Sequence, residues 1–290
     1  MTVFQDNIRL PSDIFSFLQK NSSGEVLLTT SKGIYLQFSS SIFLLMDRSY
    51  GLTPIGIGLS RFVDFATAIA PKAGQHVSVF DGCIHFPGGT LNPLWDVVDT
   101  EIFFATPLQQ QVDRCAKLLV SRCSQRSLAA LAAPLLLNQP LSSAAHNNPY
   151  CTHALPILEQ LLDAMKNQNS SNINEAVSQL LGFGIGLTPS LDDILLGMLY
   201  GLLRLAAQEG TAAILGDAIK ANAPTRTNAI SAAYLDAVAC GGCFQRLDDI
   251  LKNLSSSTPI NIEPILEIGS SSGSEMLLGL LLAIKITTKG

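Results

Sequence analysis

The hydrophobic positions of the first third of the chain have the spacing of β-strands. Between residue 25 and about residue 106, short β-branched and aromatic runs alternate with turn residues. The runs are VLLTT, GIYLQF, SIFLLM, HVSVF, CIHFP and VVDTEIFFA. Alternating runs of this length, broken by turns, are typical of antiparallel strands. We therefore expect residues 1–106 to form a β-rich, barrel-like domain.

The spacing changes after Pro107. Leu, Ala and Gln recur at helical intervals, as in PLQQQVDRCAKLLVSRC and ALPILEQLLDAMKN, and the pattern continues to the end of the chain. Clusters of Pro, Asn and Ser, such as QPLSSAAHNNPY, separate the helical stretches. The sequence thus predicts an α+β protein, in which an antiparallel β-rich domain is followed by an all-α domain at residues 107–290.

Two apolar stretches in the second half could be mistaken for membrane spans. They are ILLGMLYGLLRLAA, which begins at Ile194, and MLLGLLLAI, which begins at Met276. Both fall short of the roughly 20 residues that a bilayer crossing needs, and the first contains Arg204. We expect them to be helices buried on all sides at the centre of the α domain.

Composition and charge exclude several classes of protein. Only 14% of the residues are charged, 47% are hydrophobic, and the net charge is −5. No run of Lys or Arg provides the clustered positive charge of a nucleic-acid-binding surface.

The start, MTVFQDNIRLPSDIF, lacks the pattern of a signal or transit peptide, so we expect a cytoplasmic protein with no membrane partner. In that compartment the six scattered cysteines are expected to form no structural disulfide.

The strongest local pattern is LGFGIGLTPSLDD, a glycine-rich loop followed by a predicted helix. Gly182, Gly184 and Gly186 allow positive φ angles and close approach of a ligand to the backbone. Thr188 is suited to cap a helix whose first residue is Pro189. Unsatisfied N–H groups and the positive end of the helix dipole would then lie beside the loop, an arrangement with which proteins bind phosphate and carboxylate groups.

A structural interpretation of the same loop stays open. The glycines can form a tight connection between buried helices, and Asp192 and Asp193 can simply favour the dipole in a first helical turn. The loop lacks the ending of a phosphate-binding Walker motif, and no strand precedes it as in a dinucleotide-binding motif. An anion site of another kind is the functional interpretation.

A weaker copy of the pattern lies 82 positions later. Ser272, Gly273 and the acid at position 275 lead into an apolar helix with Gly279, just as Ser190 and the paired acids lead into one with Gly197. Two such helices packed through their glycines would bring two helix N-termini and two loops to one place. A single pocket could then use both loops.

Hydroxyl groups and one guanidinium lie between these two copies. The segment TRTNAIS, from Thr225 to Ser231, comes directly before another predicted helix. Arg226 suits a carboxylate or phosphate group, because its planar donors form paired hydrogen bonds. An ordinary helix cap is the alternative, and the sequence does not separate the two.

These three segments resemble the AllH family, formerly a domain of unknown function, in their order and spacing. The pattern of that family is Gly-x-Gly-x-Gly-Leu-Thr-Pro-Ser-Gly-Asp-Asp, and the resemblance covers most of the chain, with the β-rich part less distinctive. One departure is Leu191, which stands where the family has glycine. A branched side chain there would narrow the approach of a ligand, which leaves open a paralogue with another substrate.

The resemblance implies a subunit of an oxamate carbamoyltransferase that works in allantoin-derived nitrogen use with an acyl-CoA-synthetase-like subunit and a third subunit. The implied reaction converts oxalurate and phosphate into oxamate and carbamoyl phosphate, with no redox cofactor. Paired carboxylates would suit Mg²⁺ better than zinc if a cation took part. The alternative is a non-catalytic interaction subunit, whose apolar composition reflects a permanent interface.

The candidate site residues follow from the loop, its copy and the segment between them. Asp192 and Asp193 are the candidate catalytic residues. The expected ligand is a small anion such as phosphate or carbamoyl phosphate, and its candidate binding residues are Gly184, Gly186, Thr188, Ser190, Thr225, Arg226, Thr227, Ser231, Ser272 and Gly273. The pair Cys240 and Cys243 has the spacing of half a zinc site, but no second pair accompanies it, so we assign no metal ligands.

Overall fold

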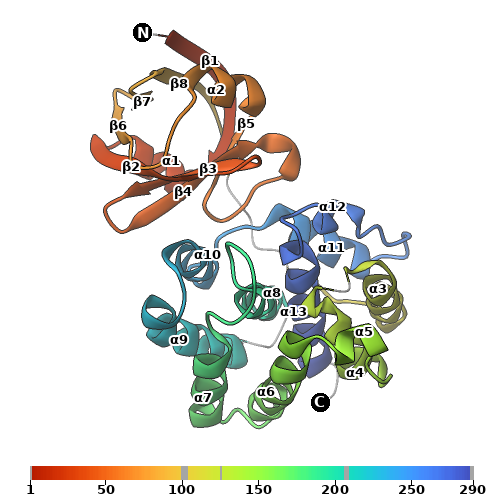
Figure 1. The fold of residues 1–290 in the computed structure, drawn as a ribbon. Coiled ribbons are helices and arrows are strands. Elements are labelled where there is room, and N and C mark those ends of the chain that lie inside the picture. Colours follow the sequence, from red (N-terminus) through yellow and green to blue (C-terminus); the bar gives the residue numbers. More distant parts are fainter. Residues whose placement is uncertain (1, 99–103, 125, 206–208, 288–290) are drawn as a thin grey trace. The chain divides into compact units, whose positions relative to one another are not determined.

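The chain forms a β-barrel unit followed by a helical unit, which confirms the α+β prediction. The computed structural model describes residues 2–98, 104–124, 126–205 and 209–287. One compact unit consists of Met1–Glu101 with Gly242–Gln245, and the other of Ile102–Gly241 with Arg246–Gly290. Figure 1 labels the strands and the α-helices of both units. The boundary between independently folding domains, placed at residues 106 and 107 by the sequence, stays a prediction.

The first unit is a closed barrel of eight strands among its described residues. The order around the barrel is β1-β5-β4-β3-β2-β6-β7-β8. The strands are β1 (Thr2–Pro11), β2 (Ser22–Thr29), β3 (Gly33–Phe38), β4 (Ser41–Asp47), β5 (Gly56–Leu59), β6 (His76–Phe80), β7 (Cys83–Phe86) and β8 (Gly89–Val98). The short helices α1 (Ser12–Leu18), η1 (Arg48–Tyr50) and α2 (Phe62–Ile69) connect them.

The barrel is mixed, whereas the sequence predicts antiparallel strands throughout. The pair β1–β8, which joins the first and last strands, is parallel, and so is β4–β5, because residues 48–55 lead the chain from the end of β4 back beside Leu44 before β5 begins. Strands β1 and β5 were not expected from the hydrophobic pattern. Of the run VVDTEIFFA, Val97 and Val98 lie in β8, residues 99–103 lie outside the described residues, and Phe104 is not in a strand. The prediction that this strand continues through Phe104 is therefore wrong.

Interior side chains of the barrel come from alternating positions, as a closed sheet requires. Ile34, Leu36 and Phe38 of β3 are 0%, 0% and 1% exposed. Phe65 of α2 packs edge-on against Phe86 of β7, with ring centroids 5.6 Å apart. The runs recognised in the sequence thus supply much of the barrel interior.

Over its described residues the second unit is helical, apart from an isolated β-bridge between Ala105 and Leu205. Its longer helices are α3 (Gln109–Arg122), α6 (Pro149–Lys166), α7 (Ser170–Leu180), α8 (Ser190–Arg204), α9 (Glu209–Arg226), α10 (Ala229–Ala239), α11 (Gln245–Leu254) and α13 (Ser272–Thr287). Shorter ones are η2 (Leu128–Leu131), α4 (Ala132–Leu137), α5 (Ser143–His146) and α12 (Glu263–Leu266).

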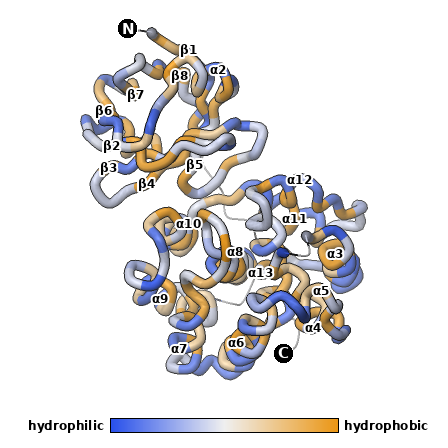
Figure 2. The backbone as a smooth tube through the Cα atoms, in the orientation of Figure 1, coloured by the Kyte–Doolittle hydropathy of each residue, from blue (hydrophilic) through white to orange (hydrophobic). Residues whose placement is uncertain are grey.

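Helices α8 and α13 form the centre of this unit, as the sequence predicts. Residues from Leu277 to Ile284 are almost wholly inaccessible, and in α8 even Arg204 is 1% exposed. Figure 1 shows the other helices of the unit around this pair, and Figure 2 shows the hydrophobic residues along α8. In the part of the chain that the structure describes, no helix combines the length and apolar character that crossing a membrane needs.

Candidate functional site

Helices α8 and α13 pack against each other through glycines. A Cβ atom on Gly197 would lie 2.0 Å from the carbonyl oxygen of Met276, and one on Gly279 would lie 2.0 Å from that of Ile194. Such distances leave no room for any side chain, so glycine at both positions lets the two backbones touch. The expectation that the two helices pack through these glycines is confirmed.

The packing is reciprocal and brings the two N-termini together. The hydroxyl of Ser190 hydrogen-bonds the carboxyl group of Glu275, and the hydroxyl of Ser272 hydrogen-bonds that of Asp193. Ser272 also lies 3.2 Å from the hydroxyl of Thr188, Oγ to Oγ1. Each serine of one helix thus reaches the acid of the other, with the same 82-residue offset as in the sequence. The glycine-rich loop and the loop before α13 meet as predicted.

Asp192 fixes the glycine loop and the segment before α10 to the start of α8. Its carboxylate accepts hydrogen bonds from the backbone N–H of Gly182 at 2.7 Å and from the hydroxyl of Ser231 at 2.6 Å. The hydroxyl of Thr227 is a third donor to the same group. In addition, the side-chain amide of Asn228 donates to the Leu187 carbonyl oxygen at 2.8 Å. Two segments about 40 residues apart are therefore held as one structure.

The glycine loop folds over the N-terminus of α8. Gly182, Gly184 and Gly186 have φ angles of 79°, 128° and 116°, as the predicted loop requires. The N–H of Leu191 donates to the carbonyl oxygen of Phe183 at 3.1 Å. The expectation of unsatisfied amides at this helix end is therefore wrong for Leu191, because the loop turns back and supplies an acceptor.

The start of the helix also differs from the prediction. Helix α8 begins at Ser190 with Pro189 as its N-cap residue, and no side chain caps it. Thr188 instead donates its hydroxyl to the carboxyl group of Asp193 at 3.0 Å. The side chain of Leu191 is fully buried and belongs to the helical core. It does not line the solvent side of the loop, where it was expected to narrow the approach of a ligand.

The remaining predicted residues lie around this junction in different surroundings. Arg226 and Thr225 are exposed at the end of α9, and the Arg226 carbonyl oxygen lies 2.0 Å from where a Cβ on Gly182 would be. Gly186 is exposed, whereas Gly273 is buried against the carbonyl oxygen of Ile265. The structure thus brings Arg226 next to the loop through its backbone, and it gives Gly273 a packing role.

Two exposed aliphatic side chains distinguish the loop surface. Ile185 is 55% exposed and Leu187 is 38% exposed. Their neighbour Phe183 stacks on His153 of α6, with ring centroids 4.3 Å apart. The loop is therefore anchored at Phe183, and it presents large apolar side chains to the solvent beyond that point.

Three buried carboxyl groups dominate the electrostatics of the junction. Asp192 and Asp193 are each 1% exposed and Glu275 is 0% exposed. Loss of hydration raises the pKa of all three, and the pKa of Asp193 lies well above its ordinary value because Glu275 also repels its negative charge. Hydroxyl and backbone N–H donors oppose this rise. The helix dipoles of α8 and α13 favour negative charge at the same place.

The raised pKa values predict an unusual dependence of stability on pH. A carboxyl group whose pKa is higher in the folded than in the unfolded state stabilises the fold most below its ordinary pKa, near pH 4. That contribution is lost as the pH rises through the raised pKa. We expect Glu275→Gln to reduce this loss, because it removes one acid and its repulsion of Asp193. Denaturant unfolding measured at a series of pH values from 4 upwards tests this expectation.

The matched control is Glu263→Gln, since Glu263 lies exposed at the start of α12 in a surface ion pair with Arg122. Relative to the unmodified protein, the control is expected to keep the same pH slope. An equal slope in the Glu275→Gln variant would contradict the assignment of coupled buried carboxyl groups.

No group of three or more His, Cys, Asp or Glu side chains in the described part of the chain is arranged to hold a metal ion. At the helix junction the carboxylate oxygens of Asp192 already accept three hydrogen bonds. A cation such as Mg²⁺ would have to displace those donors. The geometry therefore gives the Mg²⁺ hypothesis no support beyond the paired acids of the sequence.

Glu275 is the most important residue that the sequence analysis did not select. It accepts hydrogen bonds from the Leu128 N–H at 3.0 Å and from the hydroxyls of Ser127 and Ser271 at 3.3 and 3.1 Å. The 82-residue repeat offered a signal for it, because Glu275 stands at the position equivalent to Asp193. Nothing in the local sequence around Ser127 and Leu128 indicates that they complete the junction.

Residues 180–284 match the AllH family, oxamate carbamoyltransferase subunit AllH. The resemblance inferred from the glycine-rich loop is thereby confirmed over this segment. No solved structure matches the chain significantly.

The AllH match begins at the last residue of α7 and ends within α13. It contains the loop, both central helices and the segment from Thr225 to Ser231, and it does not include the barrel. Ser127 and Leu128, which bind Glu275, also lie outside the matched residues. The AllH segment therefore coincides with the helix junction, whereas the elements that support it from α3 to α6 lie beyond the match.

Proposed function

We propose that this protein is a carbamoyltransferase subunit that binds a small anionic ligand beside the glycine-rich loop. One observation carries the proposal. The residues that match the AllH family are the same residues that join α8, α13 and the segment before α10. In the proposed reaction, an oxygen of phosphate attacks the carbamoyl carbon of oxalurate. The carbon–nitrogen bond breaks, the nitrogen takes up a proton, and oxamate and carbamoyl phosphate result.

The exposed groups around the loop suit such a ligand. The guanidinium of Arg226 can form paired hydrogen bonds with phosphate or carboxylate oxygens. Gly186 is exposed and leaves its backbone open to close approach, whereas Gly184 packs directly against the backbone of Ser190 and brings the loop onto the start of α8. The hydroxyls of Thr188 and Ser272 lie at the meeting point of the two loops. These are the groups that we propose as ligand contacts, together with Ser190, Thr225, Thr227, Ser231 and Gly273 as supporting residues.

Asp192 and Asp193 act in this proposal as positioning residues. Both are almost fully buried, so neither touches a ligand in the arrangement described. Asp192 holds the loop, and Asp193 binds the hydroxyls of Thr188 and Ser272. The sequence suggests a direct catalytic role for these two acids. In this proposal they instead determine where the ligand-facing groups lie.

The test of the proposal is calorimetric titration of the protein with carbamoyl phosphate, oxamate and ATP, each with and without Mg²⁺. We expect heat of binding with carbamoyl phosphate or oxamate. The absence of heat with every one of these compounds would overturn the proposed anion site.

Asp193→Asn is expected to leave the fold intact and to weaken ligand binding strongly. Asparagine keeps the shape of the side chain and resembles the uncharged acid, so the stability of the buried junction should not fall. Its amide group cannot accept hydrogen bonds at both positions, so the hydroxyls of Thr188 and Ser272 must reorient. We expect at least about a tenfold loss of affinity for carbamoyl phosphate, equivalent to about 1.4 kcal/mol.

The control for this variant is Asp163→Asn, because Asp163 is exposed on α6 in a surface pair with Lys166. It should change neither the melting temperature nor the affinity. If Asp193→Asn instead lowers the melting temperature by many degrees while the folded fraction binds normally, Asp193 is purely structural.

A second function is favoured by the exposed side chains of Ile185 and Leu187. As a non-catalytic subunit, the protein would use this part of the loop to bind an acyl-CoA-synthetase-like partner. Large apolar groups on a surface often mark such contacts. Co-purification with that partner, combined with no ligand response of the isolated protein, would favour this function over the first.

A further inference from the structure

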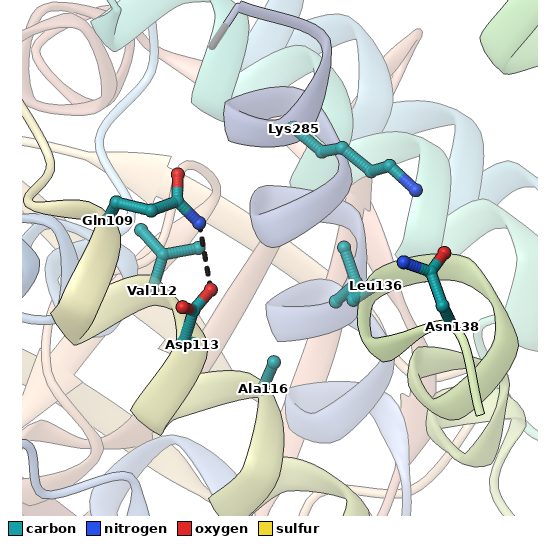
Figure 3. A pocket seen from close by; sticks show the side chains of 7 residues that line it. All are labelled: Gln109, Val112, Asp113, Ala116, Leu136, Asn138 and Lys285. Carbon is teal, nitrogen blue, oxygen red and sulfur yellow. Dashed lines mark hydrogen bonds between the residues drawn. The ribbon is translucent and has the colours of Figure 1, made fainter. Parts of the chain in front are cut away.

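A cavity of about 310 Å³ lies between α3, α4 and α13, away from the glycine loop. Figure 3 shows its lining, with Gln109 and Asp113 on one side and Lys285 and Asn138 on the other. All of its lining residues lie outside residues 180–284, the segment that matches the AllH family. The cavity is therefore separate from the site proposed above.

The two polar sides carry opposite charges. The ammonium group of Lys285 donates to the carbonyl oxygen of Leu135, which holds it at the end of α4. On the other side, the side-chain amide of Gln109 donates to the carboxylate of Asp113 at 2.8 Å, which fixes the position of the acid. Both charges are thus held by neighbouring groups and not merely carried by mobile side chains.

The surface between these charges is apolar. Val112 and Ala116 of α3 are 6% and 2% exposed, and Leu136 of α4 adds a half-buried aliphatic side chain. A simple anion would be attracted to Lys285 but repelled by Asp113. A simple cation would be attracted to Asp113 but repelled by Lys285. A ligand with both charges and a short aliphatic part complements the whole lining.

We propose that this cavity binds a small amino-acid zwitterion, with its carboxylate at the Lys285 side and its ammonium group at the Asp113 side. The side-chain amides of Asn138 and Gln109 supply further hydrogen bonds to the two ends. The methylene groups of the ligand lie along Val112 and Ala116. Because Lys285 and Glu275 belong to the same helix, a ligand bound here touches the helix that begins at the proposed anion site.

The test uses glycine, β-alanine and γ-aminobutyrate, which place the same two charges at increasing separations. Binding to the full chain is followed by calorimetry and by NMR chemical shifts at concentrations up to about 10 mM, since so small a ligand is expected to bind in the millimolar range. We expect at least one of the three to bind, and acetate and methylamine, which carry one charge each, to bind more weakly by at least about tenfold.

Two variants localise the binding. Lys285→Met and Asp113→Asn should each weaken it by at least about tenfold, which corresponds to the loss of one charge-assisted hydrogen bond. Lys117→Met is the matched control, because Lys117 is exposed on α3 and does not line the cavity. It should leave the affinity unchanged.

Asp113→Asn keeps the proposal testable even if Lys285→Met disturbs α4 through the lost contact with Leu135. Asparagine at this exposed position preserves the shape of the wall and removes only its charge. The proposal is overturned if none of the three zwitterions binds, if acetate binds as tightly as they do, or if Asp113→Asn binds them unchanged.

Discussion

Replacing Gly279 by leucine is expected to destabilise the helical unit more than any other single change considered. A Cβ at this position would lie 2.0 Å from the Ile194 carbonyl oxygen and 2.8 Å from the Met198 nitrogen. Both are backbone atoms of the facing helix, so they cannot move aside as a flexible side chain does. The helices must separate, at a cost of about 3 kcal/mol or more. Thermal unfolding should show a decrease of about 6 °C or more in the melting temperature.

Gly210→Leu is the matched control for this prediction. Gly210 lies in the first turn of α9, and a Cβ there would meet no atom within 4 Å. The control is expected to melt within a degree or two of the unmodified protein, since surface changes are usually small. Equal melting temperatures for the two leucine variants would show that α8 and α13 do not touch at Gly279.

Asp192→Ala is expected to release the glycine loop and to lower the stability of the helical unit. The change leaves the Gly182 N–H and the hydroxyls of Thr227 and Ser231 without their shared acceptor. Of these donors only the Ser231 hydroxyl is buried, and a buried unsatisfied donor costs about 1 to 3 kcal/mol, whereas the exposed Gly182 amide and the half-buried Thr227 hydroxyl can bond to water. The variant no longer buries a carboxylate, and the free energy gained in this way offsets part of the lost stability. We therefore expect a net decrease of about 1 to 2 kcal/mol in the free energy of unfolding.

Hydrogen exchange separates this local effect from a general loss of stability. The Gly182 amide and its neighbours in the loop should exchange much faster in the Asp192→Ala variant, whereas the barrel should be unaffected. Asp217→Ala serves as the control, because Asp217 is exposed on α9. Unchanged protection of the loop in the Asp192→Ala variant would contradict the role of Asp192 in holding it.

These predictions differ in how far they could have been made without a structure. The effect of Gly279→Leu follows from the sequence repeat, because two glycines at equivalent positions of two apolar helices already indicate close packing. The effect of Asp192→Ala does not, since the sequence equally allows Asp192 to face a ligand. Only the folded structure shows that Gly182, Thr227 and Ser231 surround the carboxylate of Asp192 and donate hydrogen bonds to it.

The barrel gives a similar lesson. The runs that become β3, β4, β6 and β7 were recognisable because their apolar residues alternate or cluster between turn residues. Strand β1 was not, and its parallel pairing with β8 joins residues that are nearly 90 positions apart, such as Thr2 and Gly89. Closure of the barrel depends on that pairing, which no short stretch of sequence encodes.

By itself the sequence determined the two-part fold, the central position of the apolar helices and the meeting of their loops. Each of these depends on periodicity, turn residues and a repeat, which are properties of neighbouring positions along the chain. The tertiary structure decided that the helix start at Ser190 is covered by Phe183 and that Asp193 and Glu275 are buried together. The reason is that hydrogen bonds and charge repulsion depend on the distances between side chains. Side chains such as those of Ser127 and Glu275 lie far apart in the sequence and come together only in the folded chain.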